Sequence, residues 1–357
     1  MVDAVLVLSY GGPRGPEDVL PFMRNATRGR GIPDERLVEV SGHYQRFGGV
    51  SPINARNAEL VDALRRALAE RGVAVPVVIG NRNWTPYVAD ALTEVRRLAA
   101  QEVVVVLTAA YASYSSCRQY REDFARALTE LPPVAPGETT TPITFTKVGP
   151  YAETDGFVGA NVRSLVDAVH ALGGPDQLPH VLFVTHSIPT AMDAASGPGG
   201  ETGRYSAQHE RVAEQVAAAA ASELGVDELA WEIVYCSRSG APHIPWLEPD
   251  VNDRLEELAG AGVERVVAAP IGFINDHMEV VFDLDTQARE TAERLGLAYV
   301  RAATAGVDPE FVAMLADAVV AGERGTVAGL PTCGGSCCGS GRPGGPALPT
   351  ALDNEGA

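Results

Sequence analysis

Short runs of apolar residues alternate along the chain with longer segments in which apolar residues recur every three or four positions. The runs are rich in Val, Ile and Leu and lack polar alternation, which is typical of strands buried on both faces. We expect strands at residues 4–8, 75–79, 102–107, 143–148, 180–185, 231–235, 265–270 and 297–302. The segments between them have the period of amphipathic helices, so the chain is predicted to form parallel sheets covered by helices.

The order of these elements repeats within the chain. AVLVLSYGGP near the N-terminus resembles HVLFVTHSIP in the middle, which places Tyr10 opposite His186. EVVVVLTAAYASY at 102–114 similarly resembles ERVVAAPIGFIND at 264–276. The repeat predicts an α/β protein of two similar Rossmann-like halves, each a four-stranded parallel sheet flanked by helices. A cleft is expected between the halves, at the carboxyl ends of the strands.

Three regions are expected on this basis. An N-terminal half spans residues 1–150, a C-terminal half spans residues 151–325, and a tail rich in Gly and Cys spans residues 326–357. The last helix before the tail is predicted to pack back onto the first half.

Composition narrows the possible functions. The formal net charge of −18 over 357 residues argues against a nucleic-acid partner, because phosphate binding needs clustered Lys and Arg. No apolar run approaches the roughly 20 residues of a membrane-spanning helix. The segment AVLVL near the N-terminus has no basic stretch before it and is interpreted as the first strand, not a signal peptide. A cytoplasmic protein without an integral membrane segment is therefore expected.

The segment MRNATRGRG is a local exception to the acidity. Arg24, Arg28 and Arg30 follow one another there without an intervening acid. Such a segment either meets an anionic ligand or is a solvated loop, and its sequence does not decide between the two.

Two features carry candidate chemistry. His186 directly follows the apolar run VLFVT, so it is expected at the carboxyl end of a strand, where a neutral imidazole could accept a proton. The alternative is a histidine tied to a backbone carbonyl. In INDHMEVVFDLD, a helix would place Asp276, Glu279 and Asp283 on one face, with His277 in the same turn. This carboxylate stripe is either a solvated face or a path for a divalent cation.

These segments together resemble those of ferrochelatases, which insert ferrous iron into a porphyrin. VLVLSYGGP, HYQRFGGVSPIN, HVLFVTHSIP, YCSRSG with PWLEPD, and GFINDHMEVVFDLD occur in the family's order over nearly the whole chain. The resemblance implies a metal-inserting lyase of heme biosynthesis. It implies that His186 and Glu279 are the key active-site residues, which bind the substrate Fe²⁺ and remove the pyrrole protons. Asp276, His277 and Asp283 are implied as the path for metal or protons.

The resemblance also bears on the porphyrin. The basic segment lies where some members carry an apolar lip, which favours coproporphyrin III, with four propionates, over protoporphyrin IX, the alternative. The residues implied to contact the substrate are Tyr10, Arg28, Arg30, Ser51 and Tyr120. The product would be coproheme, transferred to a coproheme decarboxylase, and the enzyme is expected to be a monomer. A non-catalytic carrier of tetrapyrrole or metal is the alternative from a different class.

The tail contains CGGSCCGSG, and some ferrochelatases hold a [2Fe–2S] cluster with C-terminal cysteines and one cysteine from mid-chain. The ligands implied here are Cys117, Cys333, Cys337 and Cys338, and the implied cluster is structural. A four-thiolate zinc site and a tail with incidental cysteines are the alternatives. Cys236 is expected to be an ordinary buried thiol.

Overall fold

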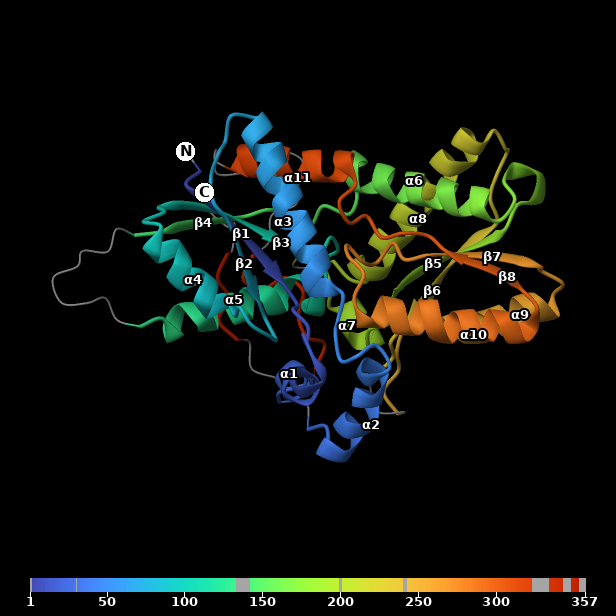
Figure 1. Cartoon of the computed structure of the whole chain (residues 1–357), viewed down its shortest axis with the longest axis horizontal. Coiled ribbons are helices and arrows are strands. Elements are labelled where there is room, and N and C mark those ends of the chain that lie inside the picture. The colour runs from blue at the N-terminus through green and yellow to red at the C-terminus, as the bar shows by residue number, and fades with distance from the viewer. Residues whose placement is uncertain are drawn as a thin grey trace.

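The computed structural model describes residues 2–29, 31–132, 142–198, 201–239, 243–322, 334–342 and 348–352. In these ranges the chain forms two four-stranded parallel sheets that lie side by side (Figure 1). The first sheet has the order β2-β1-β3-β4, with β1 (Ala4–Ser9), β2 (Val77–Asn81), β3 (Glu102–Leu107) and β4 (Thr144–Lys147). The second has the order β6-β5-β7-β8, with β5 (His180–His186), β6 (Trp231–Cys236), β7 (Arg265–Ala269) and β8 (Ala298–Arg301). The matching strand orders confirm the predicted repeat.

The central strands are buried along their whole length, which explains their unbroken apolar runs. Every residue of β1 is buried, and β5 is buried from Val181 to Thr185. The β1–β2 ladder runs from Val5 opposite Val77 to Ser9 opposite Asn81, two residues beyond the predicted end of β2. Pro76, which has no N–H to donate, lies just before the start of the strand.

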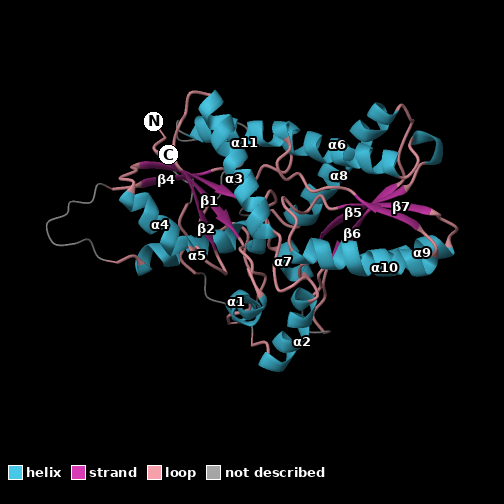
Figure 2. Cartoon of the chain, in the orientation of Figure 1, coloured by secondary structure: helices cyan, strands magenta, loops and turns pink. Residues whose placement is uncertain are grey.

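Helices cover both sheets, and two helices of the first half, α1 (Val19–Ala26) and α2 (Asp34–Gln45), project away from them (Figure 2). The first half also contains α3 (Ile53–Glu70), α4 (Val88–Arg97) and α5 (Gln119–Glu130), with short helical segments η1 (Pro16–Asp18) and η2 (Tyr114–Arg118). Helices α1 and α2 project away from the sheets at the bottom of Figure 1, and we call them the lip. Their own small core contains Val19, Phe22, Met23 and Leu37.

The second half is covered in the same way. Its helical segments are α6 (Asp155–Ala171), η3 (Pro175–Gln177), α7 (Thr190–Ala194), α8 (Arg204–Leu224), α9 (Val251–Gly260), η4 (Val280–Ala288), α10 (Arg289–Leu295) and α11 (Pro309–Gly322). Segment η4 is a π-helix, as is η2 in the first half, and this rare form is frequent at functional sites.

One hydrophobic core joins the two halves. Side chains of β1, such as Val5, belong to the same buried cluster as Phe183 of β5 and Phe311 of α11. Helix α11 lies along both α3 and α6 (Figure 1). The Arg71 Nε atom on the C-terminal side of α3 lies 2.6 Å from Asp317 Oδ1 of α11. The last helix thus contacts the first half as expected, while the region boundaries at 150 and 325 stay predictions.

Within the ranges given above, no helix is both long enough and apolar enough to cross a membrane.

Candidate active site

His186 is the last residue of β5, so its side chain leaves the sheet at the carboxyl edge. The ring Nδ1 is hydrogen-bonded to the Ser187 carbonyl oxygen. A carbonyl can only accept, so Nδ1 carries the proton, and in the neutral ring the lone pair is on Nε2. Nε2 lies 3.6 Å from Oε1 of Glu279, and 30% of the His186 side chain is exposed. The free lone pair therefore points to a carboxylate at an accessible position.

Burial and the Glu279 carboxylate act on the His186 pKa in opposite directions. Burial alone lowers the pKa of His186, but the charge and hydrogen bonding of Glu279, together with the Ser187 hydrogen bond and the Asp283 charge, outweigh it, so the pKa is raised above its ordinary value. His277 lies on the other side of the same carboxylate, with Nδ1 3.9 Å from Glu279 Oε2. Its pKa is lowered, chiefly by burial. The two imidazoles next to Glu279 thus have opposite tendencies to hold a proton.

Asp283 lies one turn further along η4. Its carboxylate accepts a hydrogen bond from Ser237 Oγ, at the end of β6. Burial raises the pKa of Asp283 to about 7, and the neighbouring Glu279 charge adds to this effect. Ser237 holds a left-handed backbone (φ 63°), which non-glycine residues adopt mostly at functional sites. Asp283 can therefore exchange a proton near neutral pH.

Asp276 lies apart from the other two acids, which corrects the expected stripe of three carboxylates on one helix face. The helix begins at residue 278, so Asp276 precedes it. Its Oδ1 accepts hydrogen bonds from Arg301 Nη1 at 3.0 Å and from Thr304 Oγ1 at 3.2 Å. Arg301 also pairs with Asp285 at 2.7 Å. Of the three acids, Glu279 is the one that pairs with His186, whereas Asp276 is paired with Arg301.

The opposite wall contains Tyr10, directly after β1, with 37% of its surface exposed. The Arg82 guanidinium lies 5.9 Å from the Tyr10 ring centroid and 4.6 Å from that of Tyr120. Tyr120 is 5% exposed and lies behind Arg82, which pairs with Asp123 at 2.6 Å. Ser51 is also buried and packs against the Tyr10 loop, since a Cβ on Gly12 would lie 2.6 Å from the Ser51 Cβ.

Helix α2 supplies two residues that the sequence did not single out. Burial raises the pKa of Tyr44 well above its ordinary value, and the Glu279, Tyr10 and Asp283 groups raise it further. Tyr44 therefore lies near groups of both walls. His43 stacks on Phe282 of η4 with 3.9 Å between ring centroids. Both residues lie in the quoted segment HYQRFGGVSPIN, but no local pattern marks them as part of the site.

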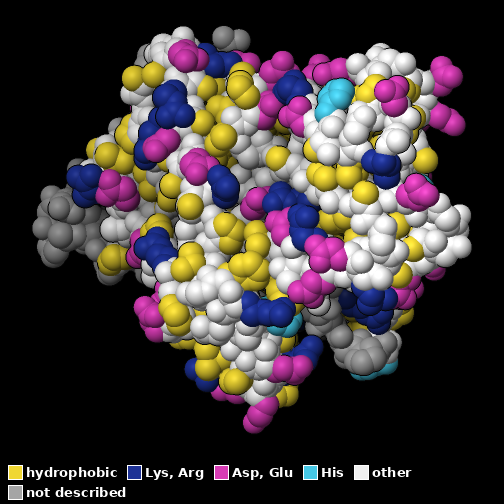
Figure 3. Space-filling view, turned by 45° about the vertical axis from the view of Figure 1, so that its right-hand side comes forward, with side chains coloured by type: hydrophobic (Ala, Val, Ile, Leu, Met, Phe, Trp, Pro, Cys, Tyr) yellow, Lys and Arg dark blue, Asp and Glu magenta, His cyan; other side chains and the backbone are white. Residues whose placement is uncertain are grey.

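The basic segment of the lip is partly neutralised. Arg24 pairs with Asp34 at 2.7 Å, whereas Arg28 donates to the neutral Asn25 side chain at 2.8 Å. Arg30 lies outside the described residues. Figure 3 shows basic and acidic side chains interspersed on one face of the molecule. Of the two described arginines, Arg28 thus keeps its charge available to an anion.

Three cysteines gather where the tail packs on the first half. Cys117, Cys337 and Cys338 are each at most 3% exposed. Arg121 donates to Cys337 Sγ at 3.3 Å, and the Gly197 amide donates to Cys338 Sγ at 3.4 Å. Cys338 has a left-handed backbone (φ 56°), and the hydrogen bond that its thiol donates to Cys337, together with burial, raises the pKa of that thiol. The side chains of these two neighbouring cysteines thus contact each other.

The fourth implied ligand, Cys333, lies outside the described residues. Among the residues that are described, no group of three or more His, Cys, Asp or Glu side chains is arranged to hold a metal ion. The described cysteines nevertheless suit an anionic cluster, because a buried guanidinium and a backbone amide already point at two of the sulfurs. Cys236 is 1% exposed, and its pKa is raised well above the ordinary value by burial, which confirms its expected place in the core.

The two-half fold is one that a solved metal-bound protein shares. SirB from Bacillus subtilis with Fe³⁺ aligns with a TM-score of 0.50 at 13% identity, covering 91% of this chain and 98% of that one. Such a likeness shows the fold alone, here the class of two-half α/β proteins with a cleft at the strand ends.

Sequence comparison is more specific. Residues 2–323 match the Ferrochelatase family, so the chain belongs to the ferrochelatase family. A relative from Streptomyces coelicolor, named coproporphyrin III ferrochelatase, is 51% identical over 94% of this chain and 90% of its own. A relative of the same name from Nocardia farcinica is 41% identical over 96% of this chain and 98% of its own. The chain is therefore a metal-inserting enzyme of that family, with porphyrin and Fe²⁺ as the substrates that fit it.

Proposed function

We propose that this enzyme inserts Fe²⁺ into coproporphyrin III, yielding coproheme and two protons. The His186–Glu279 pair at the strand ends carries the proposal, because it combines a proton acceptor with a carboxylate that can meet a cation. The names of relatives up to 51% identical support the choice of porphyrin.

The reaction needs a base, since two pyrrole N–H groups must lose their protons before four nitrogens can bind the iron. His186 Nε2 takes each proton in turn, because its Nδ1–H is already engaged by the Ser187 carbonyl. Before any proton is transferred, Glu279 and the Nε2 lone pair of neutral His186 bind the incoming Fe²⁺; once the metal has passed to the porphyrin nitrogens, Nε2 accepts a pyrrole proton and Glu279 stabilises the imidazolium that forms. The proton then leaves, and Nε2 is free to accept the second one.

Asp283 is the next carrier in this proposal. With a pKa of about 7, Asp283 can accept a proton from Glu279 and release it to solvent. His277 completes the path as a neutral ligand or relay beside Glu279. Asp276 is held by Arg301, so it would join a metal path only by exchanging that partner. We therefore assign the first transfers to Glu279 and Asp283.

The first half binds the porphyrin in this proposal. Tyr10 faces the ring from the wall opposite His186, with Ser51 and Tyr120 packed behind it. Arg28, together with Arg30, meets propionates at the lip, where the Arg28 guanidinium contacts no carboxylate among the described residues. A porphyrin with four propionates gains more from these charges than protoporphyrin IX, which has two.

Anaerobic insertion of Fe²⁺ into coproporphyrin III and protoporphyrin IX, followed in parallel by visible spectra, tests the function. We expect a higher kcat/KM with coproporphyrin III. An equal or greater value with protoporphyrin IX would overturn the substrate assignment and leave the chelatase assignment intact. Porphyrin binding without insertion of any metal would instead support the carrier.

The tail cysteines support a second element of the proposal, a [2Fe–2S] cluster held by Cys117, Cys333, Cys337 and Cys338. Four thiolates complete such a core, and Arg121 beside Cys337 offsets part of its negative charge. When bound, the cluster supplies a covalent link between the tail and η2, not a step of the metal insertion. Iron and acid-labile sulfide analysis of the purified protein tests it, and zinc in their place would identify the alternative.

We also propose a monomer in the cytoplasm that transfers coproheme to a decarboxylating enzyme. The sequence supports this without a specific contact surface. Sedimentation of the purified enzyme tests the monomer, and coproheme transfer to a purified decarboxylase tests the exchange against release into a heme-binding trap.

A further inference from the structure

The backbone of His186 is held by a tyrosine that does not face the cleft. The Tyr205 hydroxyl donates to the His186 carbonyl oxygen at 2.8 Å, and it lies 2.8 Å from Thr185 Oγ1. Tyr205 is 5% exposed, on the first turn of α8. It therefore contacts the last two residues of β5 from within the core.

The protons of this network can be counted. His209 Nδ1 lies 2.7 Å from the Tyr205 carbonyl oxygen, and its Nε2 lies 2.8 Å from Thr185 Oγ1. Burial lowers the pKa of His209 to about 3, so the ring is neutral and donates from Nδ1 alone. Thr185 then donates to His209 Nε2, and the Tyr205 hydroxyl supplies the one remaining proton. That hydroxyl lies 2.8 Å from both Thr185 Oγ1 and the His186 carbonyl, so Tyr205 is the side chain of this network that can donate to the His186 carbonyl.

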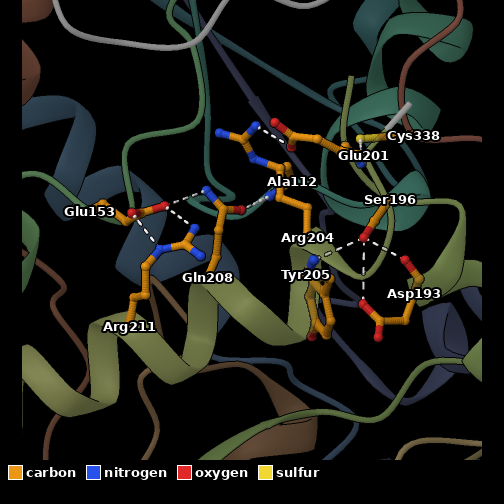
Figure 4. Close-up of polar contacts among 11 residues, drawn as sticks. Ala112, Glu153, Asp193, Ser196, Glu201, Arg204, Tyr205, Gln208, Arg211 and Cys338 are labelled. Atoms are coloured by element: carbon orange, nitrogen blue, oxygen red, sulfur yellow. Dashed lines mark hydrogen bonds and ion pairs between the residues drawn. The ribbon is translucent and has the colours of Figure 1, made fainter. Parts of the chain in front are cut away.

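Tyr205 is itself placed by a turn at the end of α7 that contacts the start of α8, and we call it the cap turn (residues 193–197). Ser196 Oγ accepts from the Tyr205 amide at 2.9 Å (Figure 4). Asp193 Oδ1 accepts from the Ser206 amide at 3.1 Å. These bonds satisfy amides at the helix N-terminus that have no partner within the helix. The position of the cap turn therefore fixes the position of the Tyr205 backbone.

The tail docks on this same turn. The Cys338 amide donates to the Gly197 carbonyl at 3.0 Å, and the Gly197 amide donates to Cys338 Sγ at 3.4 Å. On its other side the tail is bound by the first half, where Arg118 Nη1 donates to the Gly335 carbonyl at 2.7 Å. Gly341 lies so close to the Ala191 carbonyl that a Cβ would collide with it. One short segment thus joins the first half to the turn that places Tyr205.

We propose that Tyr205 is a positioning residue for His186, and that the docked tail fixes Tyr205 through the cap turn. The inference rests on the proposed function of His186. It adds the means by which the ring is held against Glu279 and names a remote segment that controls it. Small errors in the placement of a catalytic group reduce turnover strongly, whereas porphyrin binding depends on other residues.

The first test replaces Tyr205 by Phe, with Tyr151→Phe as a matched control. Tyr151 is also buried, and its hydroxyl also donates to a backbone carbonyl, that of Leu107 in the first half, at 2.6 Å. Each variant loses a buried hydroxyl that donates to a backbone carbonyl, and the Tyr205 hydroxyl also contacts Thr185 Oγ1, so both should lose thermal stability. We expect Tyr205→Phe to lower kcat about tenfold with KM for coproporphyrin III changed less than about twofold. Tyr151→Phe should leave both constants near those of the wild type.

The second test loosens the tail without altering a cysteine. Gly341→Ala collides with the Ala191 backbone, whereas a Cβ on Gly339 would meet the Ala195 Cβ at 3.7 Å, an ordinary contact. Hydrogen exchange of the peptide containing Cys338 should be faster in Gly341→Ala and unchanged in Gly339→Ala. In a double-mutant cycle, Gly341→Ala should lower kcat in the wild-type background but not further in Tyr205→Phe.

Three results would overturn the inference. They are equal kcat values for Tyr205→Phe and Tyr151→Phe, a Tyr205→Phe defect confined to KM, and additive effects in the cycle. A wild-type enzyme that fails to insert Fe²⁺ into coproporphyrin III would instead refute the proposed function. Hydrogen exchange in Gly341→Ala is read without an activity assay, so the docking of the tail is tested in either case.

Discussion

The Nε2 atom of His186 lies 3.6 Å from the Oε1 atom of Glu279, where the end of β5 meets the start of η4. Neither residue is near the other in sequence, and each comes from a different element at the carboxyl edge of the second sheet. The pair is held from both sides, since Nδ1 of His186 donates to Ser187 and the Glu279 amide donates to His277 Nδ1 at 3.1 Å.

Replacing His186 by Ala should lower Fe²⁺ insertion by about 10² to 10⁴, because the proton acceptor is lost. His180→Ala is the matched control. His180 lies at the other end of the same strand, and Glu232 keeps a second partner, Arg254 Nε at 2.6 Å. Initial rates with both variants check the prediction, and native turnover by His186→Ala would refute the catalytic assignment.

Glu279→Gln should move the titration of His186 to lower pH. Burial lowers the pKa of His186, and this carboxylate makes the largest of the contributions that raise it, so without its charge the pKa falls. Below the pH of this titration the ring is protonated and cannot act as a base. NMR titration of the His186 ring protons measures the shift directly. An unchanged titration would show that Glu279 does not interact with the ring in solution.

Asp283→Asn should stabilise the protein at neutral pH and above. The folded state holds the Asp283 proton up to a pH of about 7, whereas the unfolded chain releases it near pH 4. As the pH rises through this window, the wild type loses stability that the neutral Asn variant keeps, on the order of a few kcal/mol. Urea unfolding at pH 4.5 and 8, with the exposed Asp62→Asn as control, tests the sign. A difference between Asp283→Asn and wild type that shrinks with rising pH would contradict it.

Arg301→Gln should destabilise the fold by about 3 kcal/mol, because it leaves two poorly exposed carboxylates, Asp276 and Asp285, without their cation. Arg294→Gln, which removes an exposed pair with Glu256, should cost less than about 1 kcal/mol. Denaturant midpoints compare the two. Similar small losses would indicate that Arg301 does not hold the segment before η4.

Cys337→Ser should remove the visible absorbance and the bound iron expected of the cluster, whereas Cys236→Ser should keep both. Cys337 contacts Arg121, while Cys236 is buried in the core of the second sheet. Spectra with iron analysis distinguish the two variants. An active wild-type enzyme that is colourless and free of iron would refute the cluster.

The sequence predicted the fold well because the relevant signal is local. Buried parallel strands give uninterrupted apolar runs, and the rule that ligands meet strand ends was enough to select Tyr10 and His186. The sequence-based prediction of side-chain positions failed where the interacting partner is remote in the sequence. The spacing of Asp276 suggested a place on the helix face, but Arg301 of β8 holds it elsewhere. The placement of Tyr44 by the lip and of Tyr205 by the cap turn has no local signature either.

The two sheets have matching strand orders, and the same hydrogen-bonding arrangement occurs at the end of a central strand in each. Ser9 precedes Tyr10, and its hydroxyl accepts from Asn57 of α3 at 2.7 Å. Thr185 precedes His186, and its hydroxyl is bonded to His209 of α8 at 2.8 Å. In each half, the end of a central strand is thus held by a hydrogen bond between a hydroxyl of the strand and a side chain of a following helix. In the proposed complex, a flat ligand between these two strand ends would meet the Tyr10 phenol on one face and the His186 imidazole on the other. The two halves that present these different side chains have the same strand order.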